Sequence, residues 1–214
     1  EKKGLLNLPQ ILKRKEMRKI FTLLLVAAFG LAVNAQTDCS DLYFSEYIEG
    51  GSNNKAFEIY NPTSSDINLT GYGVALFSNG ATTTSNILQL KGTLASGEVY
   101  IVANSQSSST ILALADTTHS VTFFNGNDAL ALGKLNGMSF DTLDIIGVIG
   151  QSSTWTVGTG STSDNTLVRK SSVKAGTTSW KKSVNEWDVY NKDEFGYLGD
   201  HKSACISTGG GTKV

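Results

Sequence analysis

Cysteine, histidine and proline are all scarce in this sequence, and their scarcity limits what the protein can be. Two cysteines, Cys39 and Cys205, and two histidines, His119 and His201, occur in 214 residues. They lie too far apart to show the ligand spacing of a zinc site, so no metal site is predicted from them. Proline also occurs only twice, whereas glycine occurs 22 times, so the turns must rely on glycine.

Long hydrophobic runs are equally rare, since residues 20–33 form the only clear one. This run is too short to span a bilayer comfortably, and no second apolar stretch follows it. A basic pair precedes it and small residues follow it, which is the pattern of a secretory signal peptide over residues 17–35. We therefore predict cleavage between Ala35 and Gln36, a secreted or cell-surface product, and no membrane span in the mature protein.

The two ends of the sequence are expected to lie outside the folded domain. Residues 1–16 precede the first methionine and resemble an over-extended translation or an unusual leader. Residues 207–214 are rich in glycine and lack an apolar period, which is typical of a linker. We expect one domain over residues 36–206 and, beyond the linker, a downstream domain of the same polypeptide.

The mature chain is acidic, although the formal net charge of the whole sequence is only −1. Residues 36–214 contain 11 of the 18 Lys and Arg residues and 17 of the 19 Asp and Glu residues, which gives them a net charge of −6. An acidic domain repels polyphosphate at long range, so this balance argues against a dedicated nucleic-acid binder.

Short runs of β-forming residues, separated by turn signals, recur along the mature chain, and this spacing is typical of a β-sandwich. We predict nine strands, over residues 42–48, 56–61, 73–78, 87–90, 99–103, 121–124, 129–133, 142–149 and 166–169. The helical candidate is residues 108–115, whose apolar side chains could cover one end of the sandwich. Residues 150–165 form the longest polar, Gly-rich loop, and loops of that length are often functional or mobile.

The second predicted strand shows its orientation in its own sequence. Alternation over residues 56–60 places Phe57 and Ile59 on one face and Glu58 on the other, as expected when only one face of a sheet is buried. Pro62 follows this run, and it should end the strand.

Four stretches follow one another in a distinctive order: LYFSEYIEGGSNNKAFEIYN at residues 42–61, INLTGYGVALFSN at 67–79, LASGEVYIVAN at 94–104 and NEWDVYNKDEFGYLGDH at 185–201. This series resembles the bacterial secreted lamin tail domain family. The resemblance implies an all-β, immunoglobulin-like β-sandwich with about nine strands and little helix. It also implies a non-catalytic module, often beside an extracellular nuclease or phosphatase domain or within a large surface protein. Because a shared fold does not transfer chemistry, function must still be argued from residues.

Cys39 and Cys205 lie at the two edges of the family-like segment, in a chain predicted to enter an oxidising compartment. We predict a disulfide between them, for which the chain-entropy model gives about 5 kcal/mol of stabilisation. The alternative is two free or intermolecular thiols.

Four acidic residues near the first two predicted strands invite a metal or acid–base hypothesis: Asp41, Glu46, Glu49 and Glu58. Glu46 has the same strand parity as Leu42 and Phe44, so it would face the core, where a carboxylate needs a partner. The partner is a cation such as calcium or the backbone N–H groups of residues 50–54, unless a bulge returns Glu46 to solvent. We favour a structural role, since no calcium-loop spacing is present.

His119 and His201 are the candidates for general bases, since secreted nucleases use histidine in phosphodiester chemistry. Neither has a neighbouring carboxylate or serine motif of a known catalytic type. His201 matches the closing LG-x-H string of the resembled family, where a packing or capping role is natural. We therefore assign no catalytic residue, no metal ligand and no cofactor, with calcium as the one cofactor considered.

Five of the 11 basic residues of the mature chain fall within 14 positions: Arg169, Lys170, Lys174, Lys181 and Lys182. Trp180 lies among them, and basic groups interleaved with an aromatic ring can hold a nucleic-acid backbone and stack a base. Four acidic residues follow between positions 186 and 194 and can neutralise this basic run. We favour a solvated, ion-paired surface over a nucleic-acid site.

Trp155 lies in the long polar loop, where two interpretations are open. Its ring either stacks on a sugar or base, or plugs the end of the sandwich. Trp155 therefore joins the basic run as a speculative binding residue, whereas Trp180 and Trp187 are expected to be buried near the C-terminal edge of the domain.

These observations favour a non-catalytic accessory or interaction module of a larger secreted or cell-surface bacterial protein. In one hypothesis the module is attached to an extracellular nuclease or phosphoesterase. In a rival hypothesis it is purely structural or adhesive, and in a third it binds carbohydrate or calcium. Its partner outside the polypeptide is then a nucleic acid or a cell-surface ligand.

Overall fold

The computed structural model describes residues 39–137, 139–206 and 211–212. The predicted leader, signal peptide and cleavage site at Ala35 and Gln36 lie outside the described residues, as does most of the predicted linker. Within the described ranges, no helix is long and apolar enough to cross a membrane.

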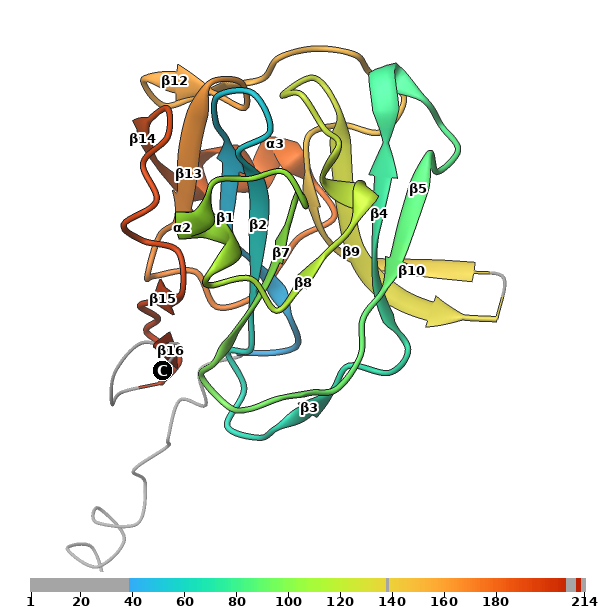
Figure 1. The fold of residues 1–214 in the computed structure, drawn as a ribbon. Coiled ribbons are helices and arrows are strands. Elements are labelled where there is room, and N and C mark those ends of the chain that lie inside the picture. The colour runs from blue at the N-terminus through green and yellow to red at the C-terminus, as the bar shows by residue number, and fades with distance from the viewer. Residues whose placement is uncertain (1–38, 138, 207–210, 213–214) are drawn as a thin grey trace, which may run out of the picture. The chain divides into compact units, whose positions relative to one another are not determined.

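Two β-sheets packed face to face form the domain (Figure 1). The first sheet has six strands, in the order β14 (Trp187–Asn191), β13 (Asn165–Arg169), β1 (Tyr43–Glu49), β2 (Lys55–Tyr60), β7 (Val99–Ala103) and β8 (Thr117–Thr118). The second has four strands, in the order β10 (Ser139–Ile146), β9 (Ala129–Asn136), β4 (Tyr72–Phe77) and β5 (Asn86–Gln89). Neighbouring strands are antiparallel except β7 and β8. The domain is therefore an all-β, immunoglobulin-like sandwich, as predicted.

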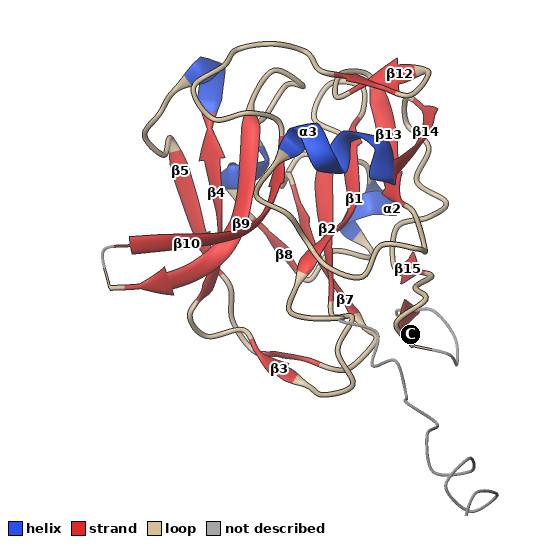
Figure 2. Cartoon of the chain, turned by 180° about the vertical axis from the view of Figure 1, so that it is seen from behind, coloured by secondary structure: helices blue, strands red, loops and turns tan. Residues whose placement is uncertain are grey.

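Short elements complete the fold. Three two-stranded ladders pair β3 (Ile67–Asn68) with β6 (Thr93–Leu94), β11 (Thr156–Val157) with β12 (Gly160–Ser161), and β15 (Asp200–His201) with β16 (Gly211–Thr212). The helical turns are α2 (Ser109–Leu112), α3 (Trp180–Ser183) and the 3-10 turns η1 (Ser78–Gly80), η2 (Ser120–Thr122) and η3 (Val184–Glu186). In Figure 2, which shows the domain from behind, α3 lies in front of the strands, and its Trp180 belongs to the main core.

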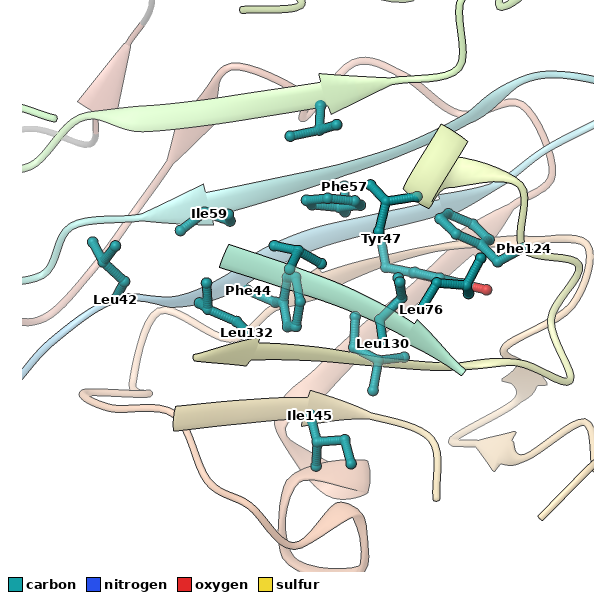
Figure 3. Packing of buried hydrophobic residues seen from close by; sticks show 14 of the residues in the cluster. Leu42, Phe44, Tyr47, Phe57, Ile59, Leu76, Phe124, Leu130, Leu132 and Ile145 are labelled. Atoms are coloured by element: carbon teal, nitrogen blue, oxygen red, sulfur yellow. The ribbon is translucent and has the colours of Figure 1, made fainter. Parts of the chain in front are cut away.

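The main hydrophobic core fills the space between the two sheets (Figure 3). Its large side chains include Phe44, Tyr47, Phe57 and Ile59 from the first sheet and Leu76, Leu130, Leu132 and Ile145 from the second. Side chains alternate between the two faces of a strand, so each strand contributes every second residue to this layer except where the alternation is interrupted. Each large apolar side chain buried here contributes about 1.5–3 kcal/mol relative to exposure.

A β-bulge decides which face the residues of β1 occupy. The pairing of β1 with β2 shifts between Phe44 and Glu46, so Ser45 is an extra residue in β1. Phe44 and Tyr47 therefore share the core face although they are three positions apart. Glu46 lies opposite Glu58 on the other face, so the expectation that Glu46 faces the main core is wrong.

The outer face of the six-stranded sheet is also buried. A second apolar cluster there joins Tyr43, Ile48, Tyr60 and Ile101 of the sheet to Ile111, Val173 and Leu198. The expectation of a single buried face is therefore wrong for β2. Glu58 is only 1% exposed, because α2 and the segments around Val173 and Leu198 cover its face of the sheet.

Four further elements differ from the sequence-based expectation. Residues 121–124, predicted as a strand, belong to η2 and the cap that follows it, because His119 accepts a hydrogen bond from Val121 and starts a turn. β14 has no counterpart among the predicted strands. The predicted helix over residues 108–115 is reduced to the four residues of α2, and the long polar loop contains the β11–β12 ladder.

Candidate functional site

Arg169, the first residue of the basic run, is buried in the fold. Its side chain is fully enclosed, with Nη1 donating to Asp144 Oδ2 at 3.0 Å and Nη2 donating to Glu186 Oε2 at 2.7 Å. The guanidinium also lies over the ring of Trp187, 4.6 Å from its centroid. Arg169 therefore cannot contact a nucleic-acid backbone, which corrects its place among the predicted binding residues.

Asp144 explains why Arg169 is held inside. Asp144 lies on β10 of the second sheet and binds Arg169 on β13 of the first. It also accepts hydrogen bonds from the backbone N–H groups of Phe44 at 3.0 Å and Thr177 at 2.9 Å. Burial raises the pKa of Asp144, whereas Arg169 and these N–H groups oppose that shift. This carboxyl group connects the two sheets, so the ion pair is structural.

The lysines of the basic run do not form one continuous site. Lys170 donates from Nζ to the carbonyl oxygen of Asn185 at 2.7 Å. The exposed lysines are Lys174, Lys181 and Lys182. Lys181 and Lys182 are neighbours on α3, so this pair is what remains of the predicted patch around Trp180.

The three tryptophans belong to the core or pack against it. Trp180 and Trp187 are 6% and 3% exposed, as predicted. Trp155 is partly buried and meets Trp180 edge-on, with ring centroids 6.4 Å apart. Its ring also covers Gly147, where an added Cβ would lie 2.5 Å from a ring carbon. Trp155 therefore plugs the sandwich, and Trp180 is not available to stack on a base.

Both histidines make structural contacts, and for His201 these agree with the predicted packing role. His201 is buried edge-on against Tyr43 and Tyr60, and the Tyr43 hydroxyl lies 3.2 Å from Nε2. Burial lowers the pKa of His201 to about 4, so its ring is neutral at neutral pH. His119 caps η2, since its Nδ1 accepts a hydrogen bond from the Val121 N–H at 3.1 Å.

Glu46 and Glu58 lie opposite each other under the outer cover of the first sheet. Glu58 accepts hydrogen bonds from Ser45 Oγ at 2.6 Å and from the Gly199 N–H at 2.7 Å. Glu46 Oε1 has no hydrogen-bond partner among the described residues. Burial, followed by the charges of Glu58 and Glu194, raises the pKa of Glu46 well above its ordinary value of 4.5. No cluster of three His, Cys, Asp or Glu side chains in the described part of the chain could hold a metal ion.

Asp41 and Glu49, the other two acidic candidates, are both ion-paired. Glu49 binds the Lys55 ammonium in a buried pair and also accepts a hydrogen bond from the Asp164 N–H. Asp41 binds Lys134 at 2.5 Å. These carboxylates therefore have protein partners, and a cation is not needed to balance them.

Cys39 and Cys205 are joined by a disulfide, with their Cα atoms 5.8 Å apart. The bond links the segment before β1 to the segment after β15. It is compatible with an extracellular location, since disulfides persist in oxidising compartments.

A pocket of about 500 Å³ lies where three loops meet at one end of the first sheet. The loops are the β1–β2 turn, the segment after β7 and the segment after η2. Four amide side chains line it: Asn53, Asn104, Gln106 and Asn125. Its volume lies in the range of about 300–1,000 Å³ that is usual for small-molecule sites. We call it the loop-end pocket.

Hydrogen bonds between the loops fix the walls of the loop-end pocket. Asn53 Nδ2 donates to Gln106 Oε1 at 2.8 Å, and Ser107 Oγ donates to the Asn53 carbonyl oxygen at 2.9 Å. The Gln106 N–H donates to Asn104 Oδ1 at 2.9 Å. These bonds hold two of the three loops, and the buried Phe124, stacked on Tyr47, holds the third. The pocket is therefore preformed, so a ligand need not order its walls on binding.

Phe123 is the exposed aromatic residue of the loop-end pocket. It is 61% exposed, the most of any large hydrophobic residue that the structure describes. The next residue, Phe124, is buried and stacks on Tyr47 with ring centroids 4.8 Å apart. Gly126 then has a φ of +77°, and an added Cβ would lie 2.7 Å from Ser163. These constraints direct Phe123 to solvent beside the amides.

The loop-end pocket presents no free charge. Lys55 is the charged residue of its lining, and its ammonium is bound by Glu49 and by the Gly50 carbonyl oxygen. The other polar side chains of the lining are amides and serine hydroxyls, which are neutral and both donate and accept hydrogen bonds. This chemistry suits the binding of a neutral polar ligand.

No pattern in the sequence singles out this pocket. Its local signals are the adjacent Phe123 and Phe124, predicted as part of a strand, and the turn dipeptide Asn125–Gly126. The pocket forms only when three loops that are far apart in the sequence meet, and no local pattern reports such a meeting.

A comparison with models of known protein families identifies the family of this domain. Residues 35–147 match the family model of the Lamin Tail Domain, which covers more than half of the sequence. The chain belongs to the lamin tail domain family. This confirms the family predicted from the sequence, and the matched range of the lamin tail domain contains all three loops of the loop-end pocket.

Among solved structures, this lamin tail domain is similar to a DUF4876 family protein from Bacteroides thetaiotaomicron VPI-5482. The similarity covers 79% of this chain and 75% of that chain, with 14% sequence identity and a TM-score of 0.48. No curated protein matches the chain.

Proposed function

We propose that this lamin tail domain is a non-catalytic interaction module of a larger exported bacterial protein, and that it binds its target through the loop-end pocket. The observation that carries the proposal is a contrast between two sets of polar groups. Arg169, His201 and Glu58, which could take part in chemistry, are buried in internal contacts. The loop-end pocket instead offers neutral polar groups and an exposed ring.

Binding without turnover fits this contrast. Amides and hydroxyls orient a ligand, but proton transfer needs an ionisable group positioned at the reacting atom. Lys55, the ionisable side chain of the pocket lining, is already paired with Glu49. The pocket therefore supports recognition rather than acid–base catalysis.

Export and attachment to other domains belong to the same proposal. The predicted signal peptide and the disulfide between Cys39 and Cys205 support a secreted or cell-surface location. Membership of the lamin tail domain family supports a place beside other domains, and we propose an extracellular nuclease or phosphoesterase as the neighbour. A purely structural or adhesive role is the rival.

Turnover assays test the proposal. The purified full chain is incubated with plasmid DNA, a generic phosphoester and a generic glycoside, with and without calcium, magnesium or zinc. We expect no product above the buffer control. Activity that survives re-purification and is lost in His119→Ala, at the half-buried capping histidine, would overturn the proposal, provided that the variant melts like the wild type.

A further inference from the structure

We propose that the loop-end pocket is a binding site for neutral carbohydrate. The inference rests on the proposed function, because it names the ligand class of the same pocket. Its basis is the combination of one exposed aromatic ring, several amides and no free charge in a preformed cavity of about 500 Å³.

Phe123 supplies a flat apolar platform. Phe123 is 61% exposed at the wall of the pocket, and the buried Phe124 next to it fixes the backbone that carries it. The face of an aromatic ring carries negative charge density, so it attracts groups with a partial positive charge. The C–H groups on one face of a sugar ring are such groups, and they offer a flat apolar surface of similar size.

The amides around Phe123 supply hydrogen bonds of the kind that hydroxyl groups need. Asn125 is exposed next to the ring, and its side-chain amide makes no hydrogen bond to any described residue, so both its donors and its acceptor are open to a ligand. Gln106 is also exposed, and it accepts from Asn53 through Oε1, which leaves its NH₂ group as a donor. Each sugar hydroxyl both donates and accepts, so neighbouring hydroxyls match such amides.

The absence of a free charge from the pocket lining selects against other ligand classes. Phosphate or carboxylate recognition relies on Arg, Lys or a cluster of N–H donors, and the Lys55 ammonium is occupied by Glu49. Nucleic acids need cations along the backbone in addition to a stacking ring. A purely apolar ligand would leave the amides of the pocket without partners, which costs free energy.

Isothermal titration calorimetry with a panel of neutral oligosaccharides tests the proposal. The panel contains hexamers of β-1,4-glucose, α-1,4-glucose, β-1,4-mannose, β-1,4-xylose and β-1,4-N-acetylglucosamine, each at millimolar concentration with the full chain. Polygalacturonate and a single-stranded oligodeoxynucleotide serve as charged comparisons. We expect at least one neutral oligosaccharide to bind, and the charged polymers not to bind at physiological salt.

Variants locate the site. Phe123→Ala and Asn125→Ala should each weaken binding, the former by about tenfold, the effect of losing one stacked ring. Tyr197→Ala is the matched control, since Tyr197 is also an exposed aromatic residue, 38% exposed, but lies on the segment between β14 and β15. It should leave the affinity unchanged. Both Phe123 and Asn125 are exposed, and thermal unfolding confirms that the variants fold.

Three results would overturn the proposal. In the first, no neutral oligosaccharide of the panel binds. In the second, a charged polymer binds and Phe123→Ala abolishes that binding. In the third, a neutral oligosaccharide binds but Phe123→Ala does not change its affinity. None of these results changes the outcome expected from the turnover assays. The proposal of a carbohydrate site can therefore be wrong while the proposal of a non-catalytic interaction module remains valid. Turnover of a bound oligosaccharide would instead defeat the proposed function and leave the ligand class intact.

Discussion

Glu46 shows at the scale of a single residue how burial sets the properties of a side chain. Parity along the strand predicts that it faces the main core, but the extra residue Ser45 turns it to the other face. That face is also buried, so Glu46 is enclosed beside Glu58 with an unpaired Oε1. The sequence predicts that a buried Glu46 needs a partner, but Oε1 has none among the described residues. The bulge that decides its surroundings has no signature in SEYIE.

Glu46→Gln should stabilise the protein at neutral and mildly alkaline pH. The pKa of Glu46 is raised in the folded state, first by burial and then by Glu58 and Glu194. The folded state therefore holds a proton that the unfolded state releases above pH 4.5, so the free energy of unfolding falls as the pH rises toward the folded pKa. Gln carries no charge and removes this loss, which we expect to be worth on the order of 1 kcal/mol.

Urea unfolding between pH 4 and pH 9 measures the effect. As the pH rises, the wild type should lose more stability than Glu46→Gln, and the difference between the two should grow. Glu98→Gln, at a half-buried position before β7, is the control and should keep the pH dependence of the wild type. A Glu46→Gln variant that is less stable than the wild type at pH 8 would show that the ionised carboxylate is the stabilising form.

At the scale of elements, the two sheets are held together by polar contacts as well as by the apolar core. Asp144 on β10 binds Arg169 on β13 and the backbone of β1 at Phe44. Sequence periodicity places β1, β10 and β13 correctly, because each is a short β-rich run between turns. Periodicity cannot show that Asp144 will pair with Arg169, which lies 25 positions later on another strand. It also cannot show that both charged side chains will be buried.

Asp144→Asn should destabilise the domain strongly. The change leaves the Arg169 guanidinium buried with one carboxylate, Glu186, instead of two. Removing one partner of a buried ion pair typically costs about 3–5 kcal/mol. Asp141→Asn, three positions earlier on β10 and exposed, is the matched control and should stay within about 0.5 kcal/mol of the wild type. Equal melting temperatures for the two variants would contradict the structural role of Asp144.

At the scale of the whole molecule, the disulfide joins the two ends of the domain. We expect the intact mass of the exported protein to be two hydrogen atoms below that of the fully reduced chain, and alkylation to require prior reduction. The double variant Cys39→Ser, Cys205→Ser should lose about 2–5 kcal/mol of stability, because the unfolded chain gains freedom. A mature protein that alkylates at both thiols without reduction would contradict the bond.

The distribution of charge over the molecule separates what the sequence can predict from what it cannot. The net charge of −6 over residues 36–214 and the family resemblance are properties of the sequence, and the resemblance leads to the correct fold. The basic run is a property of the sequence too, but the fold divides it. Arg169 and Trp180 are buried, and only the lysines keep contact with solvent. Local spacing cannot report burial that depends on Asp144 and Glu186, which lie on other elements.

The central claim is that this lamin tail domain recognises a neutral ligand at its loop end and does not hold a polyanion through its basic run. A titration of duplex DNA with the predicted mature chain, residues 36–214, over a series of salt concentrations tests it most directly, with the double variant Lys181→Ala, Lys182→Ala as the comparison. We predict little or no binding near physiological salt, because Arg169 and Trp180 are buried and residues 36–214 carry a net charge of −6. Micromolar binding with a steep salt dependence that flattens in the double variant, by about one unit of log–log slope for each lost contact, would contradict the claim.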